Sequence, residues 1–498
     1  MDSYSRKRFL ALSMMFLAGC RARSFNKVLA RPDGVRPPMP KGNLFSLRQT
    51  NFGDYVDDPL EYLADFLAQE SVLEAGVATV ADWPVNVYLV VDPLLGQKVF
   101  EDESTFGRGP AHERLRIAFG DGVFTATGSS QPRMKSALQT TLRPDAIKRM
   151  MQTVTSEIES FAQKLETEVR TSKVPVTMGL KAPIGALLQR AFVRAAFGVD
   201  VPDDVIVEMG ATWQGLIGEA KNDVWELINL YKMINGPRQR AASQNKRKLD
   251  ELLASLVAEA RHAGAPNPEG RVSLIHTLLA YRTAEGAPLT DSQILDELRT
   301  MFAAGHETTA SITCWIVHHL SLNGAAKLAL RKEARERNVG LVGAQAGDFS
   351  APLKVSQAIF MEALRLTPPA WNLPRTVVAD GAKIGAFSIP KGAAVLLSPY
   401  IFHRHPRSWP EPTSFLPGRF LAGFGDGTVR KFDNGAYFPF GDGPRACPGR
   451  GFAQSEVTYL ISRLYRNLDF QVAYEGMPAT DAKFLYSPNE VAVRVSMA

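Results

Sequence analysis

Residues 438–449 read Phe-Pro-Phe-Gly-Asp-Gly-Pro-Arg-Ala-Cys-Pro-Gly, and they enclose a single cysteine, Cys447. The three glycines and three prolines predict a tight loop, and helical texture follows over residues 452–468. A thiolate just before a helix N-terminus gains from the helix dipole and from nearby amides, and Arg445 adds a positive charge. We therefore expect a lowered pKa for the Cys447 thiol. A buried, inert cysteine would explain neither the glycines nor the arginine.

Two kinds of chemistry suit such a cysteine. Nucleophilic catalysis needs a histidine base, and the nearest candidates, His403 and His405, lie in a loop-like His-Arg-His-Pro run. A single strong thiolate ligand instead suits haem iron, where it pushes electron density toward O–O cleavage. The chain has only three cysteines, Cys20, Cys314 and Cys447, and none forms a C-x-x-C pair, which argues against a disulfide framework or a four-cysteine zinc site.

A second informative segment is a predicted helix of about 30 residues, roughly 45 Å long. Thr290 and Gln293 match a capping box, and no proline interrupts the stretch before Asn323. Residues 303–309 in its middle read Ala-Ala-Gly-His-Glu-Thr-Thr, and glycine and threonine are poor choices for a helix interior. The stretch is not a zinc-protease H-E-x-x-H motif, because Ala310 stands at the final position. A polar, bendable site indicates function, and a satisfied polar pair in the core is the alternative.

Composition excludes several classes of protein. The 498 residues are 22% charged and 45% hydrophobic, which is typical of a globular chain and not of a disordered one. Residues 1–31 hold seven basic residues and one acid, so this segment accounts for the whole net charge of +6. The rest of the chain has no basic excess for a phosphate backbone, and we expect no nucleic-acid partner. No apolar run of about 20 residues, P-loop or strand-linked G-x-G-x-x-G is present.

The N-terminal segment combines Arg6-Lys7-Arg8, an apolar stretch over residues 9–19, and Cys20. Three interpretations stay open: a short amphipathic or frayed end, peripheral membrane contact through residues 1–31, and export with acylation of Cys20 in a lipoprotein box. Four prolines over residues 32–40 predict a stiff linker. We expect residues 1–40 to be a segment with linker and residues 41–498 to be one catalytic domain.

The body of the chain is predicted to be mainly α with a small β region. Residues 147–169, 224–233 and 246–262 carry apolar side chains at helical spacing. A hairpin is expected over residues 77–80 and 85–91, and further strands over 376–378, 383–389, 395–397 and 490–495.

The cysteine loop resembles the haem-binding signature of the cytochrome P450 family through Phe440, Gly443, Arg445, Cys447 and Gly449. Residues 304–309 resemble the oxygen-binding motif of that family, and residues 362–365 its E-x-x-R helix. Arg419 stands where the family completes a Glu–Arg–Arg cluster with Glu362 and Arg365. The resemblance covers residues 41–498 and implies the cytochrome P450 fold, with a long central oxygen-binding helix over a haem.

The resemblance also implies roles for particular residues. The implied cofactor is haem b (iron protoporphyrin IX), with Cys447 as the iron ligand and Glu307 and Thr308 delivering protons. The residues implied to contact the haem are Arg445, Arg375, Phe440, Gly449, Lys135 and Gln131. Lys135 and Gln131 stand where the family often has arginine and tryptophan, and Pro132 between them is a departure. By the same resemblance, the substrate pocket includes Phe302, Ala303, Ala370, Trp371, Leu373, Leu485 and Tyr486.

We expect a haem-thiolate monooxygenase that inserts one oxygen atom from O₂ into a small apolar substrate, such as a fatty acid, terpenoid or sterol-like molecule. No flavin or iron–sulfur motif is found, so electrons are expected from a separate ferredoxin or flavoprotein reductase. The alternatives are a peroxide-using or isomerising haem-thiolate enzyme, and a haem-binding sensor without turnover. The expected location is the cytoplasm, with membrane association only through the N-terminal segment.

Overall fold

The computed structural model describes residues 59–81, 86–127, 130–172, 174–224, 236–263, 273–283, 285–340, 353–421 and 435–498. All of them belong to one compact unit, Pro38–Ala498. The predicted N-terminal segment and linker, and residues 225–233 of a predicted helix, lie outside the described residues. Within the described part of the chain, no helix is both long and apolar enough to cross a membrane.

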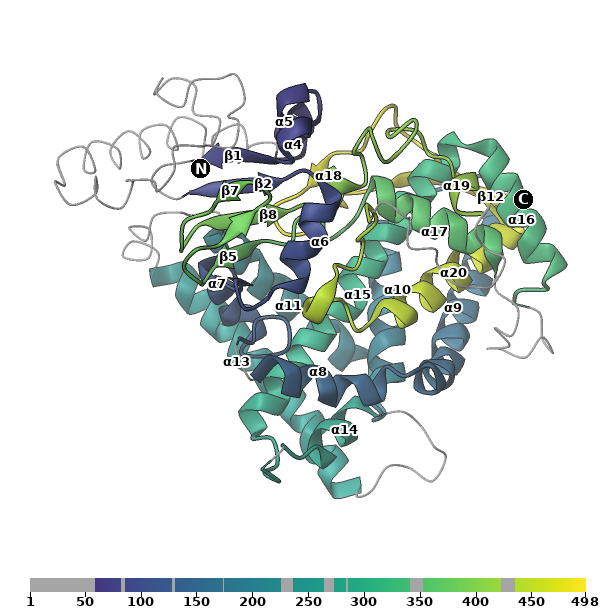
Figure 1. Ribbon diagram of the computed structural model, residues 1–498. Coiled ribbons are helices and arrows are strands. Elements are labelled where there is room, and N and C mark those ends of the chain that lie inside the picture. Colours follow the sequence, from purple (N-terminus) through teal and green to yellow (C-terminus); the bar gives the residue numbers. More distant parts are fainter. Residues whose placement is uncertain are drawn as a thin grey trace. The chain divides into compact units, whose positions relative to one another are not determined.

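Helices form most of the described structure, as the sequence predicts (Figure 1). The predicted helices over residues 147–169 and 246–262 are confirmed as α9 and α13, and the one that follows the cysteine loop as α20. The helices are α4 (Pro59–Leu67), α5 (Glu70–Ala75), α6 (Pro93–Glu101), α7 (Pro110–Phe119), α8 (Ser130–Thr141), α9 (Pro144–Ser172), α10 (Lys181–Ala196), α11 (Asp203–Val224), α13 (Gly236–Ala263), α14 (Leu274–Ala280), α15 (Asp291–Leu322), α16 (Gly324–Glu336), α17 (Lys354–Leu366), α18 (Pro399–Phe402), α19 (Gly418–Leu421) and α20 (Arg450–Asn467).

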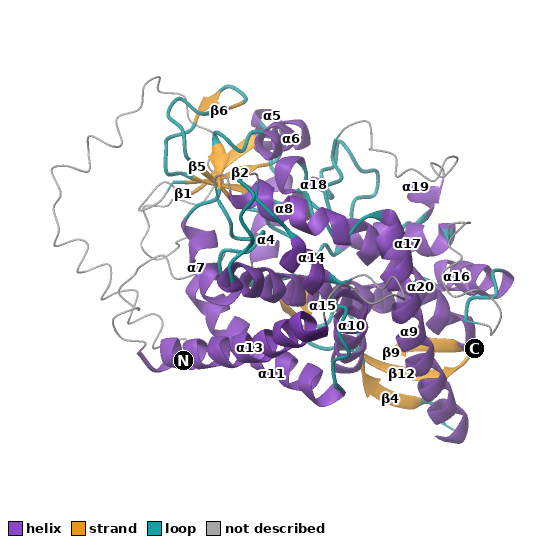
Figure 2. Ribbon diagram, turned by 90° about the horizontal axis from the view of Figure 1, so that it is seen from below, coloured by secondary structure: helices purple, strands orange, loops and turns teal. Residues whose placement is uncertain are grey.

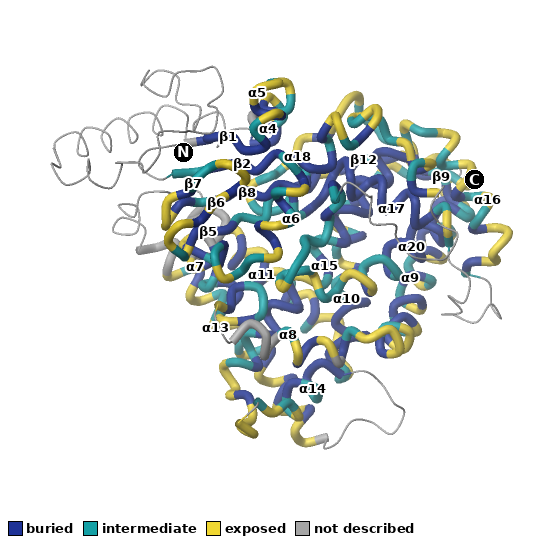
Figure 3. The backbone as a smooth tube through the Cα atoms, in the orientation of Figure 1, coloured by how far each residue is buried: buried dark blue, intermediate teal, exposed yellow. Residues whose placement is uncertain are grey.

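The long helix α15 runs through the core. Its predicted capping box is confirmed: the Thr290 hydroxyl accepts from the Gln293 amide, while the Gln293 side chain accepts from the Thr290 amide. Residues 309–320 are buried almost all round, as their apolar composition predicts. The helix packs against α10, α13 and α17, and Figure 3 shows it among mostly buried segments.

A mixed five-stranded sheet has the order β1-β2-β8-β5-β3. β1 (Val77–Ala81) and β2 (Val87–Val90) pair antiparallel, which confirms the predicted hairpin. β2 then pairs parallel with β8 (Ala394–Leu397), which pairs antiparallel with β5 (Arg375–Val377), and β5 pairs with β3 (Phe106–Gly107). These pairings bring residues 106–108 beside Arg375, although about 270 residues separate them in the chain.

A three-stranded antiparallel sheet lies away from the first one (Figure 2). Its central strand is β12 (Ala492–Met497), which confirms the strand predicted near residues 490–495, between β4 (Val176–Gly179) and β9 (Leu468–Val472). The single strand expected over residues 383–389 is wrong. Residues 383–389 instead form a hairpin of β6 (Lys383–Ile384) and β7 (Phe387–Ser388), because Gly385 adopts a positive φ of 59° and reverses the chain. A second short pair joins β10 (Thr480–Asp481) and β11 (Ser487–Pro488).

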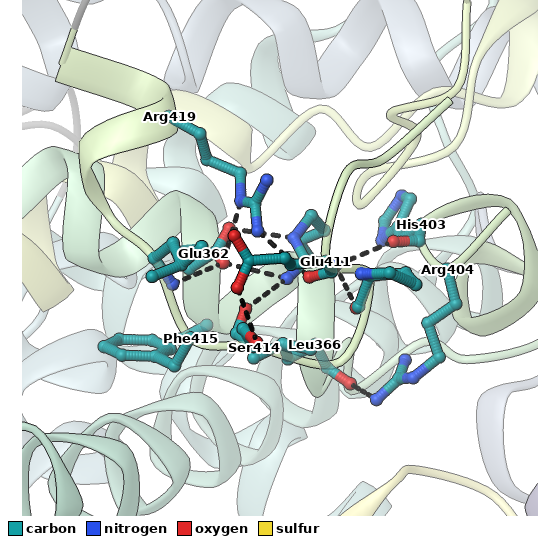
Figure 4. A network of polar contacts seen from close by, with 12 residues as sticks. Glu362, Leu366, His403, Arg404, Glu411, Ser414, Phe415 and Arg419 are labelled. Carbon is teal, nitrogen blue, oxygen red and sulfur yellow. Dashed lines mark hydrogen bonds and ion pairs between the residues drawn. The ribbon is translucent and has the colours of Figure 1, made fainter. Parts of the chain in front are cut away.

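A buried Glu–Arg–Arg cluster fixes the chain between α17 and α19 (Figure 4). Arg365 donates to both carboxylate oxygens of Glu362 at 2.8 Å, and Arg419 donates to one of them at 3.1 Å. The backbone carbonyls of His403, Pro412 and Ser414 accept the other three N–H groups of Arg365, and those of Pro410 and Glu411 accept two more from Arg419. The cluster predicted from the sequence is therefore present, and all five N–H groups of Arg365 are hydrogen-bonded.

Candidate functional site

The cysteine loop is shaped by two glycines with positive φ. Gly441 has φ 67° and Gly443 has φ 66°. A Cβ atom on Gly443 would lie 2.4 Å from the backbone oxygen of Phe100 in α6, so a larger residue would displace the loop. The Cys447 amide donates to the Phe440 carbonyl at 2.9 Å and closes the loop just before α20 begins.

The surroundings of the Cys447 sulfur differ from expectation. Cys447 is an exposed residue, but protein atoms crowd around its sulfur, and this desolvation raises the pKa of the thiol above its usual value. Hydrogen bonds from the Gly449 and Arg450 amides and the charge of Lys135 lower the pKa by less. The expectation of a lowered pKa is therefore wrong, because desolvation outweighs the amides. Arg445 does not supply the nearby charge, since it pairs with Glu103. A metal ion bound here would displace the thiol proton.

Cationic side chains gather beside the loop. Arg445 donates to Glu103 at 2.7 Å and to the Ala126 carbonyl at 2.8 Å. Burial and the charge of Arg445 lower the pKa of Arg375 to about 10, and Glu103 opposes this shift. The structure thus brings together the two arginines that the family resemblance singled out.

Two members of this group were missed by sequence reasoning, Arg108 and His112. Burial, and then the charges of Arg375 and Arg445, lower the pKa of Arg108 well below its usual value. Burial, and then the charges of Arg108, Arg375 and Arg445, also lower the pKa of His112 well below its usual value. Among the described residues, no group accepts a hydrogen bond from the buried Nε of Arg108. The sequence signal was faint: a lone arginine after Phe106-Gly107.

Of the two α8 residues that the family resemblance implies at the haem, the structure describes the side chain of Lys135 but not that of Gln131. The Lys135 ammonium donates to the Pro444 carbonyl at 2.7 Å, so Lys135 reaches the cysteine loop. Burial, and then Arg445, lower the pKa of Lys135. Gln131 belongs to α8, but its side chain lies outside the described residues.

The polar middle of α15 presents small and hydroxyl side chains. Ala304 is exposed within an otherwise buried stretch, and Glu307 and Thr308 are half-buried. The Thr308 hydroxyl donates to the Ala304 carbonyl at 3.1 Å, one turn back. Phe302 and Ala303, which were expected to line the pocket, are buried, so the exposed helix position is Ala304.

Next to this helix, aromatic rings from separate parts of the chain form one cluster, here called the aromatic wall: Phe119, Phe124, Trp213 and Phe484. The Phe119 ring centroid lies 4.9 Å from that of Phe124, 5.2 Å from that of Trp213 and 6.0 Å from that of Phe484. The Thr300 hydroxyl of α15 donates to the Phe119 carbonyl, which places the wall against this helix. Of the residues named earlier, Ala370, Leu373 and Leu485 are partly exposed, whereas Trp371 and Tyr486 are buried.

The two candidate bases for a cysteine nucleophile, His403 and His405, are both buried. The fully buried His403 accepts at Nε2 from the Phe438 amide and lies 3.3 Å from the Leu364 carbonyl through Nδ1, so both ring nitrogens are occupied. His405 is buried as well, and burial lowers its pKa. In the described part of the chain, no group of three His, Cys, Asp or Glu could hold a metal ion.

These residues fit a haem. Four cations, Arg108, Lys135, Arg375 and Arg445, interact with one carboxylate, Glu103, and the buried Arg108 Nε is unpartnered. A buried excess of positive charge calls for an anionic ligand, and haem carries two carboxylates. Cys447, an exposed residue, offers one thiolate ligand.

Comparison with known proteins gives a consistent result. The sequence profile of the family described as Cytochrome P450 matches residues 76–494. Cyclooctatin synthase of Streptomyces melanosporofaciens is 27% identical over 82% of this chain and 84% of its own length. Pentalenene oxygenase of Streptomyces avermitilis is 24% identical, with 82% and 85% covered. Steroid 17-alpha-hydroxylase/17,20 lyase of Mesocricetus auratus is 25% identical, with 77% and 76% covered.

Solved structures share the fold. The cytochrome P450DA heme domain superposes with a TM-score of 0.75 at 20% identity, covering 89% of this chain and 95% of that chain. A mutant of the same domain gives a TM-score of 0.78, with 93% and 98% covered. The family profile covers most of the chain, and the cysteine loop and the fold agree with it. The chain therefore belongs to the cytochrome P450 family of haem-iron monooxygenases.

Proposed function

We propose that this cytochrome P450 hydroxylates an apolar terpenoid, using haem b and electrons from a separate protein. The overall reaction joins R–H, O₂, two electrons and two protons to give R–OH and water. The aromatic wall beside the polar middle of α15 carries the proposal, because apolar ligands are held by aromatic surfaces with few polar groups. The names of relatives in Streptomyces, cyclooctatin synthase and pentalenene oxygenase, support this substrate class.

Haem, when bound, supplies the iron at which O₂ is activated. Cys447 would hold the iron, since the residue is exposed and its sulfur accepts hydrogen bonds from two backbone amides. Arg108, Arg375 and Arg445 hold the haem carboxylates. Phe440 and Gly449 shape the loop, and Lys135 fixes it through the Pro444 carbonyl. We assign Gln131 to the same group from its position in α8 alone.

Proton delivery is assigned to the acid–alcohol pair on α15. Thr308 carries a hydroxyl that can both donate and accept, and Glu307 beside it can hold a proton. Exposed Ala304 leaves room for substrate and O₂ one turn away. General acid catalysis of this kind is worth about 10²–10⁴-fold.

The electron donor is proposed to dock beside the cysteine loop. A hollow of about 630 Å³ lies there, and its lining includes Lys135, Arg143, Cys447 and Pro448. The basic side chains favour a donor with an acidic surface, whether ferredoxin or flavoprotein. Reduction should therefore slow as ionic strength rises, which stopped-flow measurements at several salt concentrations would check.

A spectral binding screen tests the substrate class. Terpenoid hydrocarbons and alcohols should shift the haem absorption band at micromolar concentrations, while fatty acids of similar size should not. Product must form with the reduced donor and O₂. Turnover with hydrogen peroxide alone, and none with a donor, would establish the peroxide-using alternative.

Two substitutions test the assigned residues. Cys447→Ser should abolish the thiolate-type absorption of the carbon monoxide complex, or the haem itself. Thr308→Val should still bind haem and substrate but should release peroxide in place of product. Unchanged coupling of electrons to product in Thr308→Val would remove Thr308 from the mechanism.

A further inference from the structure

One hydrogen bond joins α11 to the acid of the proposed acid–alcohol pair. The side-chain amide of Gln214 donates from Nε2 to Oε1 of Glu307 at 2.7 Å. The two residues lie 93 positions apart and belong to different helices, α11 and α15. Glu307 is half-buried and Gln214 is exposed, so the contact is made at the edge of the packed core.

The hydrogen-bond donor, the side-chain amide of Gln214, is neutral. An amide orients a carboxylate through a directed hydrogen bond but supplies no opposite charge that would hold the group ionised. The hydrogen bond thus fixes the orientation of the Glu307 carboxyl group without adding a charge beside it. A lysine or arginine at position 214 would favour the ionised carboxylate instead.

The residue before Gln214 connects the same helix to the aromatic wall. Trp213 is fully buried, and its ring lies edge-on to Phe119 with centroids 5.2 Å apart. Consecutive side chains on a helix point about 100° apart. Helix α11 therefore contacts the aromatic wall through Trp213 and contacts α15 through Gln214. Any displacement of α11 by a ligand against the wall must therefore change both contacts.

We propose that Gln214 is a positioning residue: through its hydrogen bond, the orientation of the Glu307 carboxyl depends on the position of α11 against the aromatic wall. When α11 is packed against the wall, the carboxyl is held in one place beside Thr308. When α11 moves away, the carboxyl is released and proton delivery slows. The proposal rests on the proposed function in one respect, the role of Glu307 as proton donor.

Gln214→Leu is the first test, since leucine is of comparable size and has no donor. The dissociation constant of the substrate should stay within about twofold, whereas product formed per electron should fall about tenfold, the effect expected for loss of one hydrogen bond. The matched control is Glu208→Gln, which removes the exposed 2.6 Å ion pair of Glu208 on α11 with Lys248. This control should couple electrons to product like the wild type.

A second measurement does not depend on turnover. The infrared absorption of the Glu307 carboxyl group, identified by its loss in Glu307→Gln, should shift in Gln214→Leu and stay in place in Glu208→Gln. The proposal requires both the shifted band and the loss of coupling, and either one without the other overturns it. If the wild type forms no product with any electron donor, the proposed function fails, while the infrared comparison still decides whether Gln214 orients Glu307.

Discussion

Two buried charge clusters in this protein are built in opposite ways. Around Glu362, one carboxylate meets Arg365 and Arg419, and backbone carbonyls accept the other N–H groups of Arg365 and two more of Arg419. Beside the cysteine loop, several arginines and a lysine share one carboxylate, Glu103, and the Nε of Arg108 has no acceptor among the described residues.

The difference separates structure from ligand binding. A buried cluster whose hydrogen bonds close among themselves needs nothing more and holds the chain together. A buried cluster with surplus positive charge is costly until an anion arrives, so its stability is linked to that anion. Removing a charge should therefore destabilise the first cluster and relieve the second.

The largest effect is expected at the balanced cluster. Glu362→Gln should lower the free energy of unfolding by about 3–5 kcal/mol, because two buried guanidinium groups lose their counter-charge. Guanidinium titration of the haem-free protein measures this. The control Glu70→Gln breaks a surface pair with Arg407 and should cost about 0–1 kcal/mol. Equal losses in the two variants would contradict the structural role of Glu362.

At the surplus cluster, the effect should appear in haem affinity and not in folding. Arg375→Leu should raise the haem dissociation constant about 10–100-fold through loss of a charge-assisted hydrogen bond. The haem-free protein should unfold at the same or a higher denaturant concentration, because one of several repelling cations is gone. A haem-free Arg375→Leu protein less stable than wild type would mean that this cluster is structural too.

A smaller effect concerns a buried acid that belongs to neither cluster, Glu456 of α20. Burial raises the pKa of Glu456 from 4.5 to about 8, offset only in part by the Thr309 hydroxyl, and neither carboxyl oxygen makes a hydrogen bond of good geometry among the described residues. Between these two pH values the folded state keeps this proton while the unfolded chain has lost it. The contribution of Glu456 to the free energy of unfolding is therefore highest below about pH 4.5 and falls until about pH 8, by up to about 1.4 kcal/mol per pH unit. Glu456→Gln should flatten that slope in denaturant titrations from pH 5 to 8. An unchanged slope would show that Glu456 ionises freely.

The smallest effect on either cluster is expected from the N-terminal segment. We propose a cytoplasmic protein that touches membranes through the basic and apolar residues 1–31. A chain starting at residue 36 should keep its haem content and its turnover but should no longer sediment with vesicles of anionic lipid. Loss of haem on truncation would make the segment part of the fold, and a fatty acid found on Cys20 would contradict the cytoplasmic location.

Local sequence determined a large part of the fold and the site. The cysteine loop was evident because its glycines and prolines are adjacent in the chain, and α15 because its cap and its unbroken apolar residues are continuous. Glu362 and Arg365 share one face of a helix, so their pairing follows from helical spacing.

Tertiary structure alone decided the contacts between distant segments. The pairing of β3 with β5 brings Arg108 near Arg375, and a side-chain hydrogen bond joins Gln214 of α11 to Glu307 of α15. Burial also reversed the expected shift of the Cys447 pKa, since desolvation depends on every element around the sulfur. Residue spacing reports which side chains share an element, whereas desolvation and surplus charge arise only where separate elements meet, which is why the sequence pointed to Cys447 but missed Arg108, His112 and Gln214.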